Sequence, residues 1–285
     1  MEDKLTTWWI QKLISNGADL NQPISYPNGK STTLLHIAAL EGYEDIVKLL
    51  ISNGASLEAK NHRGQTALGV AAFWNNSNIV KLLLSKGAHP YLYSAVYANN
   101  IEIVQTLLSY GANVDETKDS HCTPLHWATL YGNVEMIQLL LDHNANVNAS
   151  INQGSTPLQD AILNLNNDTL IKVTKLLLDR GANPNLSFSG QNFPFHLAVL
   201  RGCLKIVQLL SSYNVDFNHK DCFGRTSLHF LRPASQSNQT AEILEFLLRN
   251  GACVNIQDNF GNNAIENSLF WKNINIAKLF WFNSV

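Results

Sequence analysis

A repeated dipeptide constrains what this chain can fold into more than any other sequence feature. Each leucine-rich run is followed by a pair of small residues, most often Gly-Ala. The pairs are Gly17-Ala18, Gly54-Ala55, Gly87-Ala88, Gly111-Ala112, Asn144-Ala145, Gly181-Ala182, Asn214-Val215 and Gly251-Ala252. Their spacings are 37, 33, 24, 33, 37, 33 and 37 residues, so a period of 33 holds with insertions of four and one deletion of nine. Such a period predicts a stack of similar repeats and not one globular core.

Residues 119–148 illustrate what one repeat encodes. Thr123 and Pro124 predict a helix start, because threonine can cap free N–H groups and proline at the first helical position loses no hydrogen bond. Gly132 predicts a break, and a second helix follows with apolar residues at helical spacing. Asn144 stands where the sister repeats have glycine in the left-handed conformation that ends a helix.

Three segments carry a family resemblance: TTLLHIAALEGYEDIVKLLISNGA (32–55), TPLHWATLYGNVEMIQLLLDHNA (123–145) and PFHLAVLRGCLKIVQLL (194–210). They resemble ankyrin repeats, and the resemblance extends over nearly the whole chain. It implies an all-α repeat solenoid in which each repeat has a β-hairpin finger and two antiparallel helices. It also implies a protein-binding scaffold and no particular partner.

We predict a single array over residues 1–285, with a half repeat at the N-terminus that serves as a cap and a capping repeat at the C-terminus. The predicted segments are 1–21, 22–57, 58–90, 91–114, 115–147, 148–184, 185–217, 218–254 and 255–285. The repeat over 91–114 lacks nine residues, so its finger should be missing. The apolar end Phe280-Trp281-Phe282 is predicted to pack on the preceding helices; the alternative is a contact surface through which an otherwise monomeric chain self-associates.

Composition excludes several classes of protein. The net charge of −2 gives no electrostatic basis for nucleic-acid binding. No apolar run reaches about 18–20 residues, so no membrane span is expected, and the N-terminus lacks a signal-peptide pattern. The cysteines occupy unrelated positions, which predicts reduced thiols and a cytoplasmic or other reducing compartment, the host cytosol if the protein is a secreted effector. They are Cys122, Cys203, Cys222 and Cys253.

The sequence predicts neither an enzyme nor a cofactor or metal site. His36, His126, His196 and His229 recur at the fourth position of a TPLH-like tetrapeptide. The resemblance implies that this histidine bridges backbone groups between repeats. Because the copies lie on different repeats, they are too far apart to share a metal ion with bonds of about 2 Å. Motifs for phosphate binding, zinc proteases and serine hydrolases are absent.

A partner protein is predicted to bind the concave face of the solenoid, which the finger tips and the exposed side of each first helix would line. We select residues there that vary between repeats and that are polar or large, because rigid aromatic and arginine side chains dominate many interfaces. The predicted set is His62, Arg63, Gln65, Trp74, Asp119, Ser120, Trp127, Tyr131, Gln153, Asn192, Arg201, Phe223, Arg225 and Phe260.

Several roles remain open for such a scaffold. The first is an adaptor, and the asparagine, lysine and isoleucine usage suggests an effector of an intracellular microbe. A second is the substrate-recruiting module of a ubiquitin ligase, or a fragment of a larger multidomain protein. A third is a substrate of an asparaginyl hydroxylase, because Asn148 and Asn255 follow a valine and resemble the hairpin asparagines modified in ankyrin repeats.

Overall fold

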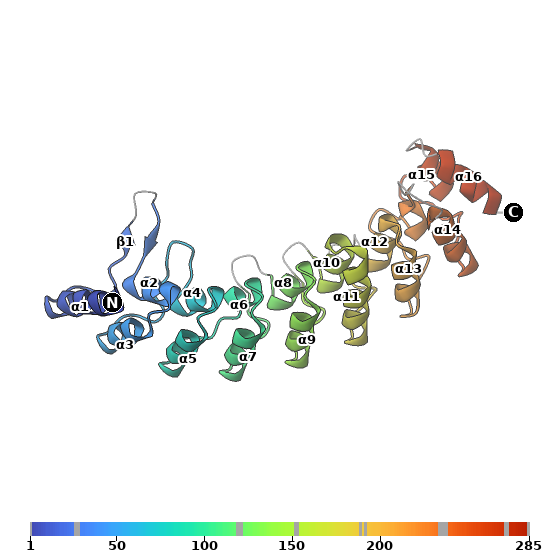
Figure 1. The fold of residues 1–285 in the computed structure, drawn as a ribbon. Coiled ribbons are helices and arrows are strands. Elements are labelled where there is room, and N and C mark those ends of the chain that lie inside the picture. Colours follow the sequence, from blue (N-terminus) through green and yellow to red (C-terminus); the bar gives the residue numbers. More distant parts are fainter. Residues whose placement is uncertain are drawn as a thin grey trace. The chain divides into compact units, whose positions relative to one another are not determined.

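The chain folds into successive pairs of short antiparallel helices, as the computed structural model shows (Figure 1). The structure describes residues 2–25, 29–117, 122–150, 154–187, 190, 193–232, 239–270 and 274–283. The predicted all-α repeat fold is confirmed. Two compact blocks are defined by their contacts. The N-terminal block is Met1–Lys118 with Asp142–Asn144, and the C-terminal block is Asp119–Leu141 with Ala145–Val285.

In the N-terminal block, first helices form one row and second helices form another (Figure 1). The first-helix row is α2 (Leu34–Glu41), α4 (Ala67–Phe73) and α6 (Tyr93–Tyr97). The second-helix row is α1 (Glu2–Ser15), α3 (Glu44–Ser52), α5 (Ser77–Ser85) and α7 (Ile101–Ser109). Helix α1 contacts α3, which places it where a second helix belongs.

The C-terminal block repeats this arrangement. Its first helices are α8 (Pro124–Leu130), α10 (Pro157–Asn164), α12 (Pro194–Arg201), the 3₁₀ helix η1 (Ser227–Phe230) and α15 (Ala264–Phe270). Its second helices are α9 (Val134–Asp142), α11 (Asn167–Asp179), α13 (Leu204–Ser211), α14 (Gln239–Arg249) and α16 (Ile274–Asn283). Neighbouring first helices contact one another from α8 to α15.

The core lies between the two rows and is built from small residues facing large ones. Ala38 and Ala39 of α2 are buried, as are Ile46, Val47 and Leu50 of α3. The same pattern recurs in the next helix pairs. Alanine lets the helices approach closely, and the branched side chains of the second helix fill the remaining space at crystal-like density.

The fingers differ from the predicted hairpins in one respect. Among the described residues, only the first finger has strands, β1 (Ile24–Ser25) and β2 (Ser31–Thr32), which pair antiparallel. The other described fingers are tight turns, each tied to the finger before it by a backbone hydrogen bond. These bonds run from His62 N–H to Ser31 O (2.9 Å), from Cys222 N–H to Gly190 O (2.8 Å) and from Asn259 N–H to Phe223 O (2.8 Å).

The repeat over 91–114 has no finger, because the chain passes from buried Ala88 to helix α6 at Tyr93 within a few residues. A second irregularity was not predicted. Helix η1 replaces the α-helix that the resemblance implies after Thr226, and Leu231 is already extended (φ −60°, ψ 125°). Pro233 limits how far this helix could run, because a proline disfavours the helical conformation of the residue before it, here Arg232.

The apolar C-terminal end divides between core and surface. Phe280 is completely buried, which agrees with the predicted packing of this end. Trp281 is 73% exposed, whereas the side chain of Phe282 lies outside the described part. Self-association through this end stays a prediction, and within the described part it would depend on Trp281.

Replacement of Gly111 by valine is expected to destabilise the protein by about 1–2 kcal/mol, because a β-branched residue resists a positive φ. Gly111 has φ +85°, and no atom lies within 4 Å of the Cβ that a side chain would add, so the cost is conformational and not steric. Gly111→Asn is the matched control, since Asn144 (φ 63°) and Asn214 (φ 56°) occupy the equivalent position. Chemical denaturation measures both; equal stability of the valine and asparagine variants would contradict this explanation.

Candidate protein-interaction surfaces

A histidine near the start of several first helices joins three parts of the fold. His36 Nδ1 accepts a hydrogen bond from Thr33 N–H (3.4 Å) and lies 2.8 Å from Thr33 Oγ1, while Nε2 lies 2.8 Å from Gln65 O in the next finger. His126 makes the same contacts with Thr123 and with Ser155 O. His229 repeats them with Thr226 and with Asn262 O. The predicted bridge between repeats is therefore present.

The partners of these histidines determine their protonation state. A carbonyl oxygen can only accept, so Nε2 carries the proton, and a backbone N–H can only donate, so Nδ1 must be unprotonated. The imidazole is thus neutral. Burial lowers the pKa of His36, His126 and His229, and the backbone carbonyl contacts oppose that shift in part. A catalytic proton transfer would break the bridge, so these groups are structural.

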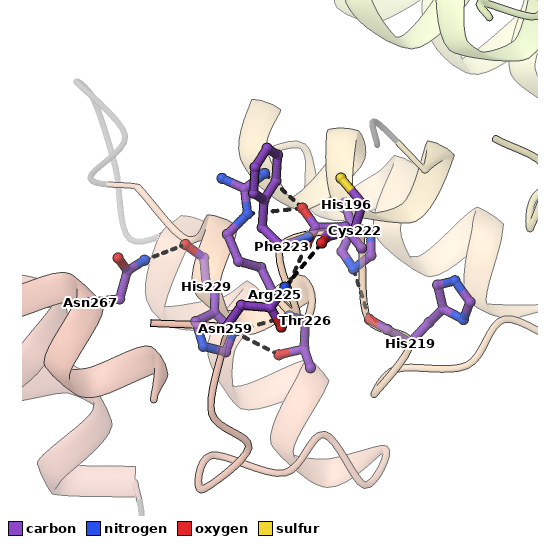
Figure 2. A network of polar contacts seen from close by, with 10 residues as sticks. His196, His219, Cys222, Phe223, Arg225, Thr226, His229, Asn259 and Asn267 are labelled. Atoms are coloured by element: carbon purple, nitrogen blue, oxygen red, sulfur yellow. Dashed lines mark hydrogen bonds and ion pairs between the residues drawn. The ribbon is translucent and has the colours of Figure 1, made fainter. Parts of the chain in front are cut away.

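His196 departs from the pattern because Phe193 replaces the threonine. Its Nε2 lies 3.1 Å from His219 O, and no described residue bonds its buried Nδ1. Burial lowers the pKa of His196 to about 4, despite the His219 carbonyl and the nearby carboxylate of Asp221. Figure 2 shows His196 and His219 beside the polar network of the next finger.

Exposed aromatic side chains gather on the first helices and fingers. Between the terminal helices α1 and α16, the exposed described aromatics in these elements, or within two residues of them, are Trp74, Tyr91, Tyr97, Tyr131, Phe223, Phe260 and Phe270. In the same part of the described chain, Tyr110 is the exposed aromatic residue that follows a second helix. In these middle repeats the exposed aromatic residues therefore lie mostly on or beside the elements that the sequence predicted for binding, whereas the terminal helices α1 and α16 expose Trp8, Trp9 and Trp281. Tyr91, Tyr97 and Phe270 were missed, because the selection favoured tryptophan, arginine and the finger tips.

In the N-terminal block, an aromatic cluster lies beside the fingerless repeat. The Phe73 ring stacks with the Tyr97 ring (centroids 6.0 Å apart) and meets the Trp74 ring edge-on (5.6 Å). Tyr93 also stacks with Tyr97 (6.0 Å). Trp74 is 58% exposed. His62 and Arg63 are exposed on the adjacent finger, whereas Gln65 is half-buried.

The predicted residues of helix α8 form a stacked pair. The rings of Trp127 and Tyr131 lie 6.2 Å apart at 23°. Trp127 is half-buried and Tyr131 is 53% exposed, so Tyr131 offers the greater accessible face. Asp119, Ser120, Gln153 and Asn192, which were predicted on finger tips, lie outside the described residues.

Arg201 has a structural role that its sequence position did not reveal. Its guanidinium donates hydrogen bonds to the carbonyl oxygens of Ile162 and Leu165 at the end of helix α10. These carbonyls have no partner within their helix, and a cation is favourable at a helix C-terminus. Since its donors are engaged within the fold, we do not carry Arg201 forward as a contact residue.

At the other end of the C-terminal block, the last two fingers border a pocket of about 820 Å³. Its lining includes Arg225, Phe230, Arg232, Asp258, Phe260 and Phe270. Two predicted residues, Arg225 and Phe260, therefore lie on one cavity, with Phe260 76% exposed. Phe223 is nearby, with its ring centroid 4.8 Å from the Arg225 guanidinium carbon (Figure 2).

Comparison with known proteins identifies the family. The model of the family described as ankyrin repeats (3 copies) matches residues 6–94, 92–188, 169–258 and 195–283. The chain belongs to the ankyrin repeat family. The ankyrin repeat domain of human ASB11 has a similar structure, with a TM-score of 0.60 and 24% identity over 78% of this chain and 99% of that chain. At that identity the likeness concerns the fold alone. No curated protein matches the sequence.

The two asparagines proposed for hydroxylation occupy different surroundings in their ankyrin repeats. Asn148 is half-buried; its Nδ2 donates to Gly181 O (3.1 Å) and its Oδ1 accepts from Asn183 N–H (2.8 Å). Asn255 is exposed. An enzyme would have to release Asn148 from the next repeat before acting on it. Modification at either site stays a prediction.

Two further findings concern what the ankyrin array lacks. Across the described ranges, no group of three or more His, Cys, Asp or Glu side chains could hold a metal ion. A helix long and apolar enough to cross a membrane is also missing from those ranges.

His126→Gln is expected to weaken the dependence of stability on pH. Above about pH 6.5 the imidazole is neutral in both the folded and unfolded chain. As the pH falls below that value, only the unfolded chain gains the proton, so stability is lost at up to about 1.4 kcal/mol per pH unit for each buried histidine. Gln159 shows that glutamine can keep the cap, because its Oε1 accepts from Thr156 N–H (2.7 Å).

Urea denaturation between pH 5 and 7.5 tests this expectation. The glutamine variant should lose less stability than the wild type between pH 6.5 and 5. His126→Ala is the control, because it removes the cap and should be less stable at every pH. Parallel wild-type and glutamine curves over that range would contradict the proposed neutral bridge.

Proposed function

We propose that this protein is a non-enzymatic scaffold that binds another protein across the fingers and exposed sides of its first helices. One observation supports the proposal: between the terminal helices α1 and α16, the exposed aromatic residues of the described chain concentrate on or beside those elements, while the second helices α3, α5, α7, α9, α11, α13 and α14 expose none. Tyrosine, tryptophan and phenylalanine bury much area at little entropic cost, so such a surface suits protein binding.

The hydrogen bonds within the fold support this proposal. The histidines, the finger carbonyls and Arg201 are hydrogen-bonded within the array. Ankyrin repeats bind other proteins, and their fold is typically a non-enzymatic binding module. Because these recurring hydrogen bonds lie within the fold, we assign recognition to exposed aromatic side chains such as Trp74, Tyr97 and Tyr131.

The narrower roles differ in the partner that they require. An effector of an intracellular microbe would bind a host protein, whereas a substrate-recruiting module would bind a protein destined for ubiquitin transfer. Both use the same binding surface, so the identity of the captured partner distinguishes them. Both are adaptors, and the adaptor role is the one that we propose.

Trp74→Ala/Tyr97→Ala/Tyr131→Ala should reduce partner capture at least about tenfold, because truncating central aromatic residues often costs more than a kcal/mol each. The matched control is Tyr110→Ala/Trp281→Ala, which removes exposed aromatics from the second-helix side and the C-terminal helix. Quantitative affinity purification with mass spectrometry compares the wild type and both variants, after circular dichroism has established that they are folded.

Proteins captured by the wild type and the control, and lost from the triple variant, would support binding at the aromatic face. Equal loss in both variants would indicate nonspecific aromatic adhesion. Equal capture by all three chains would contradict the proposed surface.

A further inference from the structure

The last two fingers are copies of one turn. In the finger Asp221–Thr226, Asp221 N–H donates to Arg225 O (2.9 Å), and Asp221 Oδ1 accepts from the N–H groups of Phe223 (2.9 Å) and Arg225 (2.8 Å). In the finger 258–263, Asp258 N–H donates to Asn262 O (2.9 Å), and Asp258 Oδ1 accepts from Phe260 (2.9 Å) and Asn262 (3.0 Å). Equivalent positions in the two turns can therefore be compared directly.

In the first copy, an arginine completes the turn. Arg225 donates from Nε (2.8 Å) and Nη2 (2.6 Å) to Asp221 Oδ2, and the Asp221 side chain is wholly inaccessible. The guanidinium carbon lies 4.8 Å from the Phe223 ring centroid (Figure 2) and 4.5 Å from the Phe230 ring centroid. A planar cation thus bonds a carboxylate and lies against aromatic rings, an arrangement that suits guanidinium better than ammonium.

In the second copy, the place of the arginine is vacant. Asn262 stands at that position, and its side chain is short and uncharged. No described side chain bonds Asp258 Oδ2, although Asp258 is only 9% exposed. The equivalent of Phe223 is Phe260, which is 76% exposed. The last finger therefore keeps the carboxylate and the aromatic ring of the arrangement but not the cation.

The vacant position faces the pocket described above. Asp258 and Phe260 both line it, and Phe230, Leu231 and Phe270 add apolar surface. Arg225 also lines it, but its charge is compensated by Asp221. Arg232 lies on the same pocket with an exposed side chain, and no hydrogen bond joins it to Asp258. A partly buried carboxylate beside an exposed ring favours a cation that can form paired hydrogen bonds.

We propose that this pocket binds an arginine of the partner protein, with its guanidinium on Asp258 Oδ2 and against the Phe260 ring, and with apolar neighbours of that arginine in contact with Phe230 and Phe270. The site reproduces between two chains what Asp221, Phe223 and Arg225 do within one. It rests on the proposed function and specifies the chemistry that one part of the binding surface recognises.

A peptide titration tests the site without knowledge of the partner. The probe is an acetylated, amidated peptide of sequence Gly-Ser-Leu-Arg-Phe-Ser-Gly, and its counterpart carries citrulline in place of arginine, which has a similar shape and no charge. NMR shifts of the backbone amides of Phe260 and Asn262 report binding locally, because both amides donate to Asp258 Oδ1. The arginine peptide should give saturable shifts at an affinity at least about tenfold above that of the citrulline peptide.

Two variants of the full chain separate recognition from folding. Asp258→Asn should keep the turn, since Asn61 Oδ1 accepts from Arg63 N–H (2.9 Å) and Gln65 N–H (3.0 Å) in an earlier finger, and it should lose the preference for arginine. Asn262→Arg supplies the missing guanidinium within the chain, so it should abolish peptide binding without lowering the melting temperature. Glu242→Gln is the control, because it removes an exposed charge on α14 away from the pocket lining.

Equal affinities for the arginine and citrulline peptides would overturn the proposal, as would wild-type binding by the Asp258→Asn or Asn262→Arg variant. An absence of saturable shifts with either peptide would overturn it too. These outcomes leave the aromatic face untested, because its variants do not touch this pocket. Conversely, loss of arginine recognition in Asp258→Asn with unchanged partner capture by the Trp74/Tyr97/Tyr131 variant would uphold the pocket and contradict the broader surface.

Discussion

The hydrogen bond from a first-helix histidine to the carbonyl of the next finger is the interaction on which this array depends. His36 caps its own helix through Thr33 and reaches Gln65 O in the following repeat. His229 does the same with Thr226 and Asn262 O. One neutral imidazole thus couples the start of a helix to the position of the neighbouring finger. Because the group is buried, losing either partner would leave a polar atom unsatisfied, which costs more than the bond itself contributes.

One exception to this rule accompanies the fingerless repeat. Gly69 occupies the histidine position in the repeat that precedes it, and a Cβ there would lie 3.1 Å from Ser94 Oγ. With no finger after it, a histidine at this place would have no carbonyl to reach, and the space is taken by the next helix. Trp74 and Tyr97, close to the place of the missing finger, are exposed.

Function follows from the same division between inward and outward groups. The bridges, the caps and Arg201 satisfy the backbone, so they carry the fold and offer little to a partner. Recognition is left to side chains that the repeat does not need, and these are aromatic at several places on the first-helix side. The last finger adds a polar group to this surface. Asp258 Oδ1 stabilises the turn, whereas Asp258 Oδ2 is not bonded by an arginine as Asp221 Oδ2 is by Arg225.

The sequence by itself determined the period, the helix pairs and the missing finger, because each of these depends on local residues that recur at a fixed spacing. The structural role of the histidines came from the resemblance to ankyrin repeats. The sequence also placed Trp74, Tyr131 and Phe260 on the exposed side, since variation between repeats reports exposure. It did not reveal that Arg201 bonds Ile162 O and Leu165 O, or that Thr226 opens a 3₁₀ helix. Only the tertiary structure decided that Arg201 is hydrogen-bonded within the fold and that Asp258 Oδ2 has no arginine partner. Arg201 and its two carbonyls are more than thirty residues apart in the sequence and meet only when repeats stack. The pocket beside Asp258 arises for the same reason, from residues of neighbouring repeats that no local pattern connects.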